Sequence, residues 1–587
     1  MAKISLNSGS STCLHVAALV CLLSTGIPSM ALADSSDCSL TIDQLQATDF
    51  KSSLVVNGER TRVANGTPLE PFQPIAKPTQ IGFMPNNNRE IFFNEIYKGT
   101  IKKWNMEAKT MTTLLDLDLV TTGERGLTGF VFHPNFEKNR WVFVVYNESN
   151  KLVKLARFEY DLATDKLINP KILLEHKIKT DLHHYANGQL TMDESGFLFM
   201  GMGSDADYAG NTLYGTDIIW NAEATGGNTN TISSGFIRII PDSSEKGYKI
   251  PAGNFGEYFE KYFRDKGNVA VADEYKTKVL PEIYVKGIRT CYTATAHPKK
   301  GWLAWGEVNT STNWDEYDIV KTPMFSGYPY FHGNNETLKG ANPNINASPT
   351  QPVPNKSTFN TGVSLLPPPQ AQSLPPLNKG IPTASVAGAI YDFNSHAGLN
   401  RFPKAFDQNL LMFDFEMQKM HMFVSKLEEN GSMIKANPKV DVSRLLGGVF
   451  MRYTLDAAFS PAGELYLLNV GDNTYGTCGN QCGSIDKIIY TGGQCTQTVA
   501  VHSSSQKVRF ARVGNEIQST STTPLNIRMH NLAGKRILSA TLLPGKYLNL
   551  AQALSGKESV SKAGTVFILT LSNEGVVQSE KFVFSKG

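Results

Sequence analysis

The chain has 587 residues, of which 41% are hydrophobic and 10% aromatic, so it is a folded globular protein and not a disordered one. Its formal net charge of +3 lacks the basic surplus that nucleic-acid-binding proteins carry. Its length is ample for a large hydrophobic core together with an accessory domain.

The N-terminus predicts export. Lys3 precedes an apolar run over residues 13–23, and residues 31–33 (Ala-Leu-Ala) provide a small-x-small cleavage site. The run is shorter than the ~20 residues that cross a bilayer, and no later segment has the composition of a transmembrane helix. We therefore expect residues 1–33 to be a signal peptide and the mature protein to reach the periplasm, the cell surface or the medium.

Short apolar strands after turn signals recur along the chain. Residues 89–104, REIFFNEIYKGTIKKW, predict a hairpin whose turn contains Lys98 and Gly99. The same pattern, a turn signal followed by a short apolar strand, is found at residues 196–203, 301–308, 409–415 and 463–472. Short strands with Gly-rich turns and few helical periodicities predict an all-β fold of antiparallel sheets repeated around an axis. The spacing fits a six-bladed β-propeller better than a sandwich.

The stretch GERGLTGFVFHPNF, residues 123–136, is followed at once by the apolar run 141–146. Together they predict a strand, a tight Gly-containing turn and a second strand. A strand with period 2 buries one face, so Glu124 and Arg125 are expected where a loop enters a central cavity. The alternative is a surface salt bridge beside a hairpin, since exposed ion pairs are common and weak.

Seven cysteines are present, and two of them lie in the predicted signal peptide. Cys478 and Cys482 enclose a loop small enough for a local disulfide, and Cys38 could pair with Cys495. Cys291 would then remain free. A zinc site in the 478–495 region is the alternative, but no histidine or fourth close cysteine completes it.

Two composition changes suggest boundaries. Residues 341–383 are rich in Pro, Asn and Ser, and they predict a long ordered excursion or a loop between blades. Near residues 495–508, Thr, Ser and Gln replace the strand pattern, and short alternating strands reappear afterwards. We therefore expect a propeller over residues 34–500 and a small separate β-sandwich over residues 507–587.

Several segments resemble the glucose/sorbosone dehydrogenase family in collinear order from about Pro78 to Tyr490. They are residues 123–136, 186–203, 220–241, 282–308, 326–335, 401–423 and 454–472. The resemblance implies a six-bladed propeller that binds pyrroloquinoline quinone (PQQ) and calcium. It also implies the oxidation of an aldose or related sugar, with transfer of electrons to an external acceptor.

The resemblance implies a histidine base in a turn of the type H-x-G-G-x-L. The corresponding string here is HHYANGQL, residues 183–190. Without a gap the histidine position falls on Tyr185, whose phenol would ordinarily titrate near ~10. A one-residue bulge before Asn187 would instead bring His184 into the site, so His184 is the predicted catalytic base.

Two arginines are predicted to bind the cofactor. Arg289, in VKGIRT, matches the arginine of the family motif G-x-R-N-P, where a guanidinium faces the quinone; Thr290 and Cys291 replace the Asn-Pro of that motif. The fork of donors on an arginine suits carboxylate and quinone oxygens. Arg452, just before the last blade strand, would supply a second cation.

The family holds calcium largely through backbone carbonyls of a loop that follows the strand GWLAWGEV. The resemblance therefore places Asn309 and Thr310 as metal ligands, with Glu307 and Glu316 nearby. Hard cations take oxygen ligands, including main-chain carbonyls. Asp205 is either another residue of the rim or part of a solvated turn.

Two other functions fit the same fold. One is a propeller without cofactor that binds carbohydrate or protein at the same face, as the altered histidine and G-x-R-N-P motifs permit. The other is a metal-dependent propeller hydrolase such as a lactonase. The tail from residue 507 loosely resembles C-terminal sorting domains of bacteria that export proteins to the cell surface, and an unspecialised β-sandwich module is the alternative.

Overall fold

The computed structural model describes residues 40–58, 63–64, 67–119, 121, 124–178, 188–205, 221–308, 315–333, 335–338, 342, 345–369, 384–396, 398–415, 421–431, 433–446, 453–471, 482–492, 510–513, 516–519, 524–531, 536–554, 566–573 and 576–583. Within these residues the fold is nearly all β. No helix among them is long and apolar enough to cross a membrane.

Six sheets, which we call blades 1 to 6, make up the larger part of the fold. Blade 1 contains β4 (Pro78–Gly82), β5 (Glu90–Glu95), β6 (Thr100–Asn105) and β7 (Thr110–Asp116). Blade 2 contains β8 (Leu127–Phe132), β9 (Trp141–Ser149), β10 (Leu152–Asp161) and β11 (Lys166–Lys177). Blade 3 contains β12 (Leu190–Met192), β13 (Leu198–Met202), β14 (Gly235–Pro241), β15 (Tyr248–Lys249), β16 (Ile283–Lys286) and β20 (Met324–Phe325).

The remaining blades follow in chain order, except for one strand. Blade 4 contains β17 (Ala294–Ala296), β18 (Leu303–Glu307) and β19 (Glu316–Val320). Blade 5 contains β25 (Ser385–Ile390), β26 (Asn409–Asp414), β27 (Met422–Asn430), β28 (Met433–Ala436) and β29 (Val440–Asp441). Blade 6 contains β30 (Thr454–Phe459), β31 (Leu465–Asn469), β32 (Ser484–Tyr490) and, from the N-terminal end, β1 (Phe50–Asn57).

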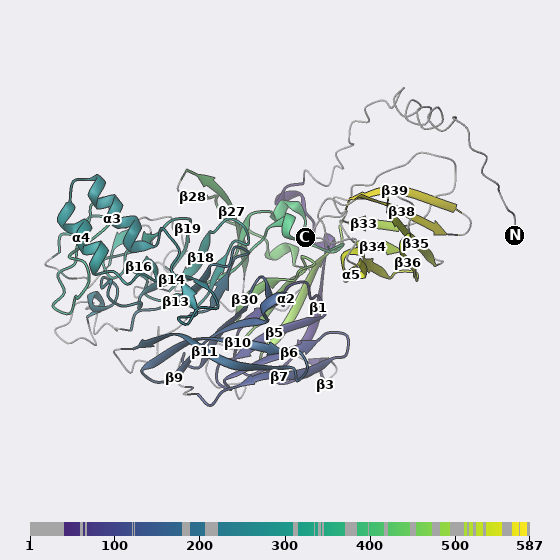
Figure 1. Ribbon diagram of the computed structural model, residues 1–587, viewed down its shortest axis with the longest axis horizontal. Coiled ribbons are helices and arrows are strands. Elements are labelled where there is room, and N and C mark those ends of the chain that lie inside the picture. The colour runs from purple at the N-terminus through teal and green to yellow at the C-terminus, as the bar shows by residue number, and fades with distance from the viewer. Residues whose placement is uncertain are drawn as a thin grey trace, which may run out of the picture.

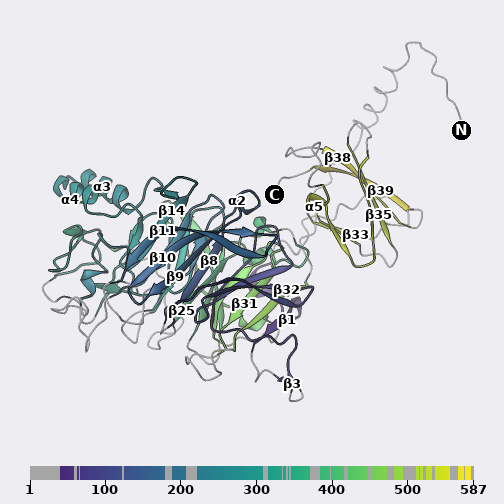
Figure 2. The ribbon, with the colours of Figure 1, turned by 60° about the horizontal axis from the view of Figure 1, so that its bottom comes forward.

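The blades form a closed ring. Their innermost strands contact one another in the cyclic order β4, β8, β12, β17, β25, β30 and again β4. The ring closes within blade 6, because β1 pairs with β32 in antiparallel register from Phe50 opposite Tyr490 onward. The predicted six-bladed propeller is therefore confirmed, and Figures 1 and 2 show its strands, purple to green, grouped apart from the yellow C-terminal strands.

Local predictions also hold. The hairpin of β5 and β6 turns at Gly99, whose φ of 64° favours glycine. The segment after β8 differs from expectation, because a short helix, α2 (Phe136–Asn139), replaces the predicted Gly-containing turn. Arg125 is 1% exposed and donates to Asn150 Oδ1, so the alternative of an exposed surface salt bridge at this position was wrong.

Polar side chains join the inner strands around the axis. Inner strands lack a partner on one edge, and their buried backbone groups need other hydrogen bonds. Gln80 donates to Leu190 O at 2.7 Å, Asp456 Oδ2 accepts from Ile81 N at 2.9 Å, and Thr293 Oγ1 accepts from Ala387 N at 2.8 Å. Each of these bonds connects two different blades, so the axis is held by side chains as well as by apolar packing.

Asp456 makes the stability of the propeller depend on pH. Burial raises the pKa of its carboxyl to about 7, from 3.8, against backbone hydrogen bonds that lower it. The folded chain therefore keeps a proton that the unfolded chain releases, and stability falls as pH rises from about 4 to about 7 by up to ~1.4 kcal/mol per pH unit. In the Asp456→Asn variant, the free energy of unfolding should decline less between pH 5 and pH 8. Urea unfolding at these two pH values, in the presence of a chelator, measures the difference. An unchanged decline would show that Asp456 does not titrate in this range.

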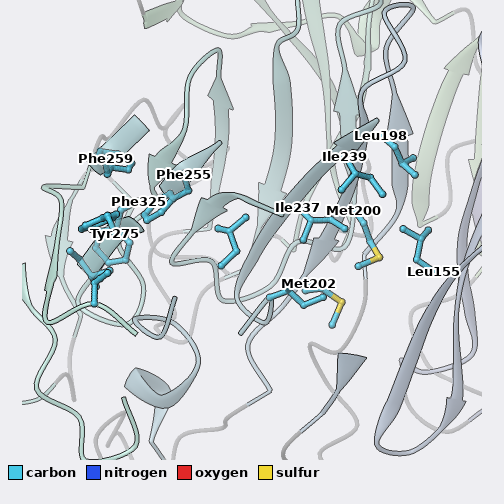
Figure 3. Packing of buried hydrophobic residues seen from close by; sticks show 14 of the residues in the cluster. Leu155, Leu198, Met200, Met202, Ile237, Ile239, Phe255, Phe259, Tyr275 and Phe325 are labelled. Atoms are coloured by element: carbon cyan, nitrogen blue, oxygen red, sulfur yellow. The ribbon is translucent and has the colours of Figure 1, made fainter. Parts of the chain in front are cut away.

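Blade 3 carries the largest hydrophobic cluster and two helices that the sequence reading missed. Helices α3 (Phe255–Asp265) and α4 (Val269–Thr277) lie between β15 and β16. Phe255, Phe259 and Phe263 recur every four residues, which places them on one face of α3, and all are buried. Figure 3 shows Phe255, Phe259 and Tyr275 in the same cluster as Met200 and Ile237 of the blade.

Residues 345–369 of the Pro-rich segment pack against blade 3. It contains β23 (Val353–Pro354) paired with β24 (Leu365–Leu366), and Val353 and Leu366 belong to the same hydrophobic cluster. Asn355 Nδ2 donates to Gly227 O at 2.5 Å. These residues are thus packed against the fold, while the bounds expected for the insertion, residues 341–383, remain a prediction.

The C-terminal strands form two further sheets. One contains β33 (Phe510–Val513), β34 (Glu516–Ser519) and β37 (Tyr547–Asn549); the other contains β35 (Leu525–Asn531), β36 (Arg536–Leu542), β38 (Val566–Asn573) and β39 (Val576–Val583). Helix α5 (Leu550–Leu554) follows β37. A buried cluster over residues 517–571 contains no propeller residue, as expected for a β-sandwich with its own core.

Limited proteolysis should cut the full chain near residues 495–508 and leave two resistant fragments. The reason is that the two hydrophobic cores share no residue, so few contacts should oppose cleavage between them. Fragment masses check this. Cleavage mainly within residues 341–383, with none near residue 500, would contradict the predicted boundary.

Candidate functional site at one mouth of the propeller

Most predicted site residues lie outside the described residues. They are His184, with its neighbours His183 and Tyr185, then Arg452, Asn309 and Thr310. Their roles remain predictions. Arg289, Glu307 and Glu316 are described, and the structure brings them together at the end of the propeller where β17 begins and β18 ends, which we call one mouth.

The backbone of Arg289 is held on both sides. Its N–H donates to Glu307 Oε1 at 2.8 Å, and its carbonyl accepts from Ser204 N at 2.7 Å. Its side chain is 8% exposed, and Nη1 donates to Val308 O at 2.7 Å. A guanidinium with five donors in a loop fixed in this way suits a ligand with carboxylate or quinone oxygens.

Glu307, Glu316 and Asp318 form a buried carboxylate cluster, which we call the blade 4 cluster. One oxygen from each residue lies within 4.8 Å of the others. The cluster follows from strand register, because Glu307 lies directly opposite Glu316 on β18 and β19, and Asp318 is two residues further along the same face. Like charges directly opposite each other are destabilising, so this arrangement needs protons or a cation.

Polar groups of β18 itself and of neighbouring loops donate to the cluster. Glu307 also accepts from the Trp305 indole at 3.4 Å, Asp318 Oδ2 accepts from Ser326 Oγ at 3.1 Å, and Glu316 Oε1 accepts from Gly333 N at 2.8 Å. Three buried oxygen ligands of this type match the donor set of calcium, which tolerates flexible geometry. Among the described residues, no other group of three such side chains meets the same distance.

The charges of the cluster are costly without a cation. Burial, followed by the charge of Asp318, raises the pKa of the Glu307 carboxyl to about 8. Burial also raises the pKa of the Asp318 carboxyl to about 7, although the Ser326 hydroxyl opposes this shift. A bound divalent cation would replace protons here, because carboxylates must be ionised to act as ligands.

Asp318 is the residue of the cluster that the sequence reading missed. The signal was present in WDEYD, where Glu316 and Asp318 alternate on one face of a strand. Asp205 was expected at a rim or in a solvated turn, but it is 2% exposed, so a solvated turn is wrong.

Cys291 is free, as expected, and the structure buries it. It packs against two glycines: a Cβ at Gly188 would collide with Cys291 O, and one at Gly201 would lie 2.8 Å from Cys291 Sγ. Cys291, which stands where the family motif has proline, therefore lies against two residues that have no side chain. Cys482 is disulfide-bonded, and its expected partner Cys478 lies outside the described residues.

A separate cavity of about 310 Å³ lies at the opposite mouth of the propeller. It is lined by residues of the six inner strands and of the segments that follow them, including Phe83, Asp193, His396 and Phe459, and not by Arg289 or the blade 4 cluster. The two mouths are thus distinct in their chemistry.

Comparison with known proteins finds a similarity to one family over part of the chain. Residues 75–217 match the family model described as Glucose / Sorbosone dehydrogenase. A crystal structure of a glucose dehydrogenase is 16% identical, covers 74% of this chain and 98% of its own, and has a TM-score of 0.48. The apo soluble aldose sugar dehydrogenase of Escherichia coli is 16% identical, with coverages of 75% and 99% and a TM-score of 0.46. The PQQ-bound aldose sugar dehydrogenase of Streptomyces coelicolor is 13% identical, with coverages of 75% and 98% and a TM-score of 0.46.

Proposed function

We propose that this chain, which resembles the glucose/sorbosone dehydrogenases, is an exported oxidoreductase that oxidises an aldose or related sugar with PQQ and calcium. The observation that carries the proposal is the close placement of Arg289 and the blade 4 cluster at one mouth, in a chain whose residues 75–217 match that family. When bound, PQQ supplies an electrophilic quinone that takes up hydride from the sugar.

The chain's own residues have separate roles in this proposal. Arg289 would bind an acidic cofactor through charge-assisted hydrogen bonds, because its guanidinium is fixed beside the mouth. The blade 4 cluster would hold calcium through its carboxylates, together with carbonyls of Asn309 and Thr310. His184 would remove the proton of the reacting sugar hydroxyl, and Arg452 would add a second cation for the cofactor.

Calorimetry tests this proposal on the full chain. PQQ is titrated in saturating calcium and, separately, in chelator. We expect PQQ to bind in calcium and to bind much more weakly in chelator. Absence of binding in saturating calcium would contradict the quinoprotein function.

The blade 4 cluster alone also suits a metal-dependent hydrolase such as a lactonase, which would need metal but no quinone. The same titration separates the two functions. Metal binding without PQQ binding, together with lactone hydrolysis, would favour the hydrolase.

Terbium luminescence should report on the metal site directly. Trp305 Nε1 lies 3.4 Å from Glu307 Oε2, so excited tryptophan should sensitise a terbium ion bound in the cluster. Asp318→Asn should weaken terbium binding about tenfold or more, because it removes a ligand charge while leaving an acceptor for Ser326. Asp456→Asn, at the axis and outside the cluster, is the matched control. Equal affinity in wild type and Asp318→Asn would exclude the cluster as the metal site.

We also propose that the signal peptide and the C-terminal tail serve export and sorting. Residues 1–33 and most of the segment that joins the two cores lie outside the described residues. Deletion of residues 507–587 should leave a folded propeller that is no longer attached to the cell surface. Unchanged location in cell fractionation would favour an unspecialised accessory module.

A further inference from the structure

Gln189 joins three blades at the axis of the propeller. Its side chain is 1% exposed, and Nε2 donates to Thr79 O of blade 1 at 2.6 Å. Its Oε1 accepts from Ala294 N of blade 4 at 3.3 Å, and its backbone N–H donates to Tyr292 O at 3.2 Å. The side chain also lies near Asp456 of blade 6, where it acts to lower the pKa of that carboxyl. One buried amide therefore meets groups from blades 1, 4 and 6.

The partners of Gln189 at blade 4 lie in the loop that carries Arg289 or directly after it, at the start of β17. Tyr292 and Ala294 follow Arg289 by three and five residues. The other end of the loop is held by the bonds of Arg289 to Glu307 and Ser204. The loop is thus fixed near Arg289 by one set of bonds and at its C-terminal end by Gln189.

The residue before Gln189 also contacts this loop. Gly188 lies so close to Cys291 O that no Cβ fits between them, and Gly188 O accepts from Thr128 Oγ1 at 3.4 Å. The Gly188–Gln189 pair is therefore seated between the Arg289 loop on one side and blades 1 and 2 on the other.

We propose that Gln189 is a positioning residue for Arg289, fixing residues 287–294 relative to the inner strands of blades 1 and 3. The role rests on the proposed function, in which the Arg289 guanidinium binds an acidic cofactor. Removing the amide takes a buried hydrogen-bond partner from the Ala294 N–H and from the Thr79 carbonyl. The Ala294 N–H can replace this bond only if residues 287–294 move. Gln189 touches no reacting group in this account and acts through Arg289.

Gln80 provides a matched control. It is also a buried axial glutamine, and it donates to Leu190 O at 2.7 Å and accepts from Phe130 N at 3.0 Å. It makes two bonds between blades, as Gln189 does, but neither goes to residues 287–294. Gln189→Met and Gln80→Met keep similar side-chain volumes and remove equivalent bonds.

Hydrogen exchange in the full chain without PQQ or metal tests the positioning itself. We expect backbone amides over residues 287–294 to exchange at least about tenfold faster in Gln189→Met and at the wild-type rate in Gln80→Met, while both variants unfold at similar, lower temperatures. Equal exchange of this segment in both variants would overturn the proposal. If Gln189→Met does not fold, Gln189→Glu serves, since it keeps an acceptor for Ala294 N–H. In Gln189→Glu, the backbone amides of residues 287–294 should exchange at the wild-type rate, and the amides near Thr79 should exchange faster. The reverse result would overturn the proposal.

A double-mutant cycle tests the consequence for ligand binding. Gln189→Met should weaken PQQ binding about tenfold in the wild-type background and have no effect in an Arg289→Ala background, because both changes remove the same interaction. Equal weakening in both backgrounds would show that Gln189 does not act through Arg289. If wild-type protein binds no PQQ, the proposed function fails, and the exchange experiment still decides the positioning role.

Discussion

Replacing His184 with alanine is expected to lower turnover about 10²- to 10⁴-fold while leaving the affinity for PQQ unchanged. A general base contributes this much to rate because it removes the hydroxyl proton in the transition state, and it makes no contact that holds the cofactor. Steady-state kinetics with saturating PQQ and calcium measure turnover, and calorimetry measures affinity.

His183→Ala and Tyr185→Phe are the controls for this choice of base. Both residues are neighbours of His184 in the segment HHYANGQL, and neither change should lower turnover to the same extent. Normal turnover of His184→Ala in protein that binds PQQ would show that another residue is the base. The control variant that loses activity would then identify it.

Arg289→Ala should weaken PQQ binding about 10- to 150-fold, which corresponds to the ~1.5–3 kcal/mol of a hydrogen bond to a charged group. The backbone bonds of Arg289 to Glu307 and Ser204 do not involve its side chain, so the loop should keep its position in this variant. Arg289→Lys, which keeps the charge but loses the planar fork, should give an intermediate affinity. Unchanged affinity in both variants, measured by calorimetry, would remove Arg289 from the cofactor site.

The fold was predictable because the strands carry their own signals. Apolar runs bounded by turn residues, such as the hairpin at Gly99, determine each strand locally. The spacing of these runs along the chain indicated six blades, and the resemblance of the collinear segments implied the same number. Helix α3 was missed because its phenylalanines, spaced by four, lie in a long insertion between β15 and β16, where an all-β pattern was expected.

The candidate site was predictable only in part. Arg289 and Glu316 were expected near the cofactor and metal from motif positions, and they do lie close to Glu307. Asp318 and Gln189 were missed because their importance comes from contacts between strands and between blades. The register in which β19 pairs with β18 places Asp318 in the cluster. Closure of the ring of blades places Gln189 beside Thr79 and Ala294. A single segment does not contain such information.

Burial of charge also escapes a reading of the sequence. Arg125, in a charged pair, was expected where a loop enters a central cavity or in an exposed salt bridge, and it is buried with a partner in a neighbouring hairpin. The three carboxylates of the blade 4 cluster are equally buried. Charged residues are rarely buried without partners, so such positions are candidates for ligand or metal binding once the structure is known.

The most direct test of the central claim is the reduction of an electron-accepting dye by sugar. The purified full chain is assayed with an aldose alone, with calcium, with PQQ, and with both together. The proposed function predicts sugar-dependent reduction only when PQQ and calcium are both present. No reduction under any of these conditions, in protein that binds sugar or a protein partner, would contradict it and favour a propeller that binds ligands without catalysis.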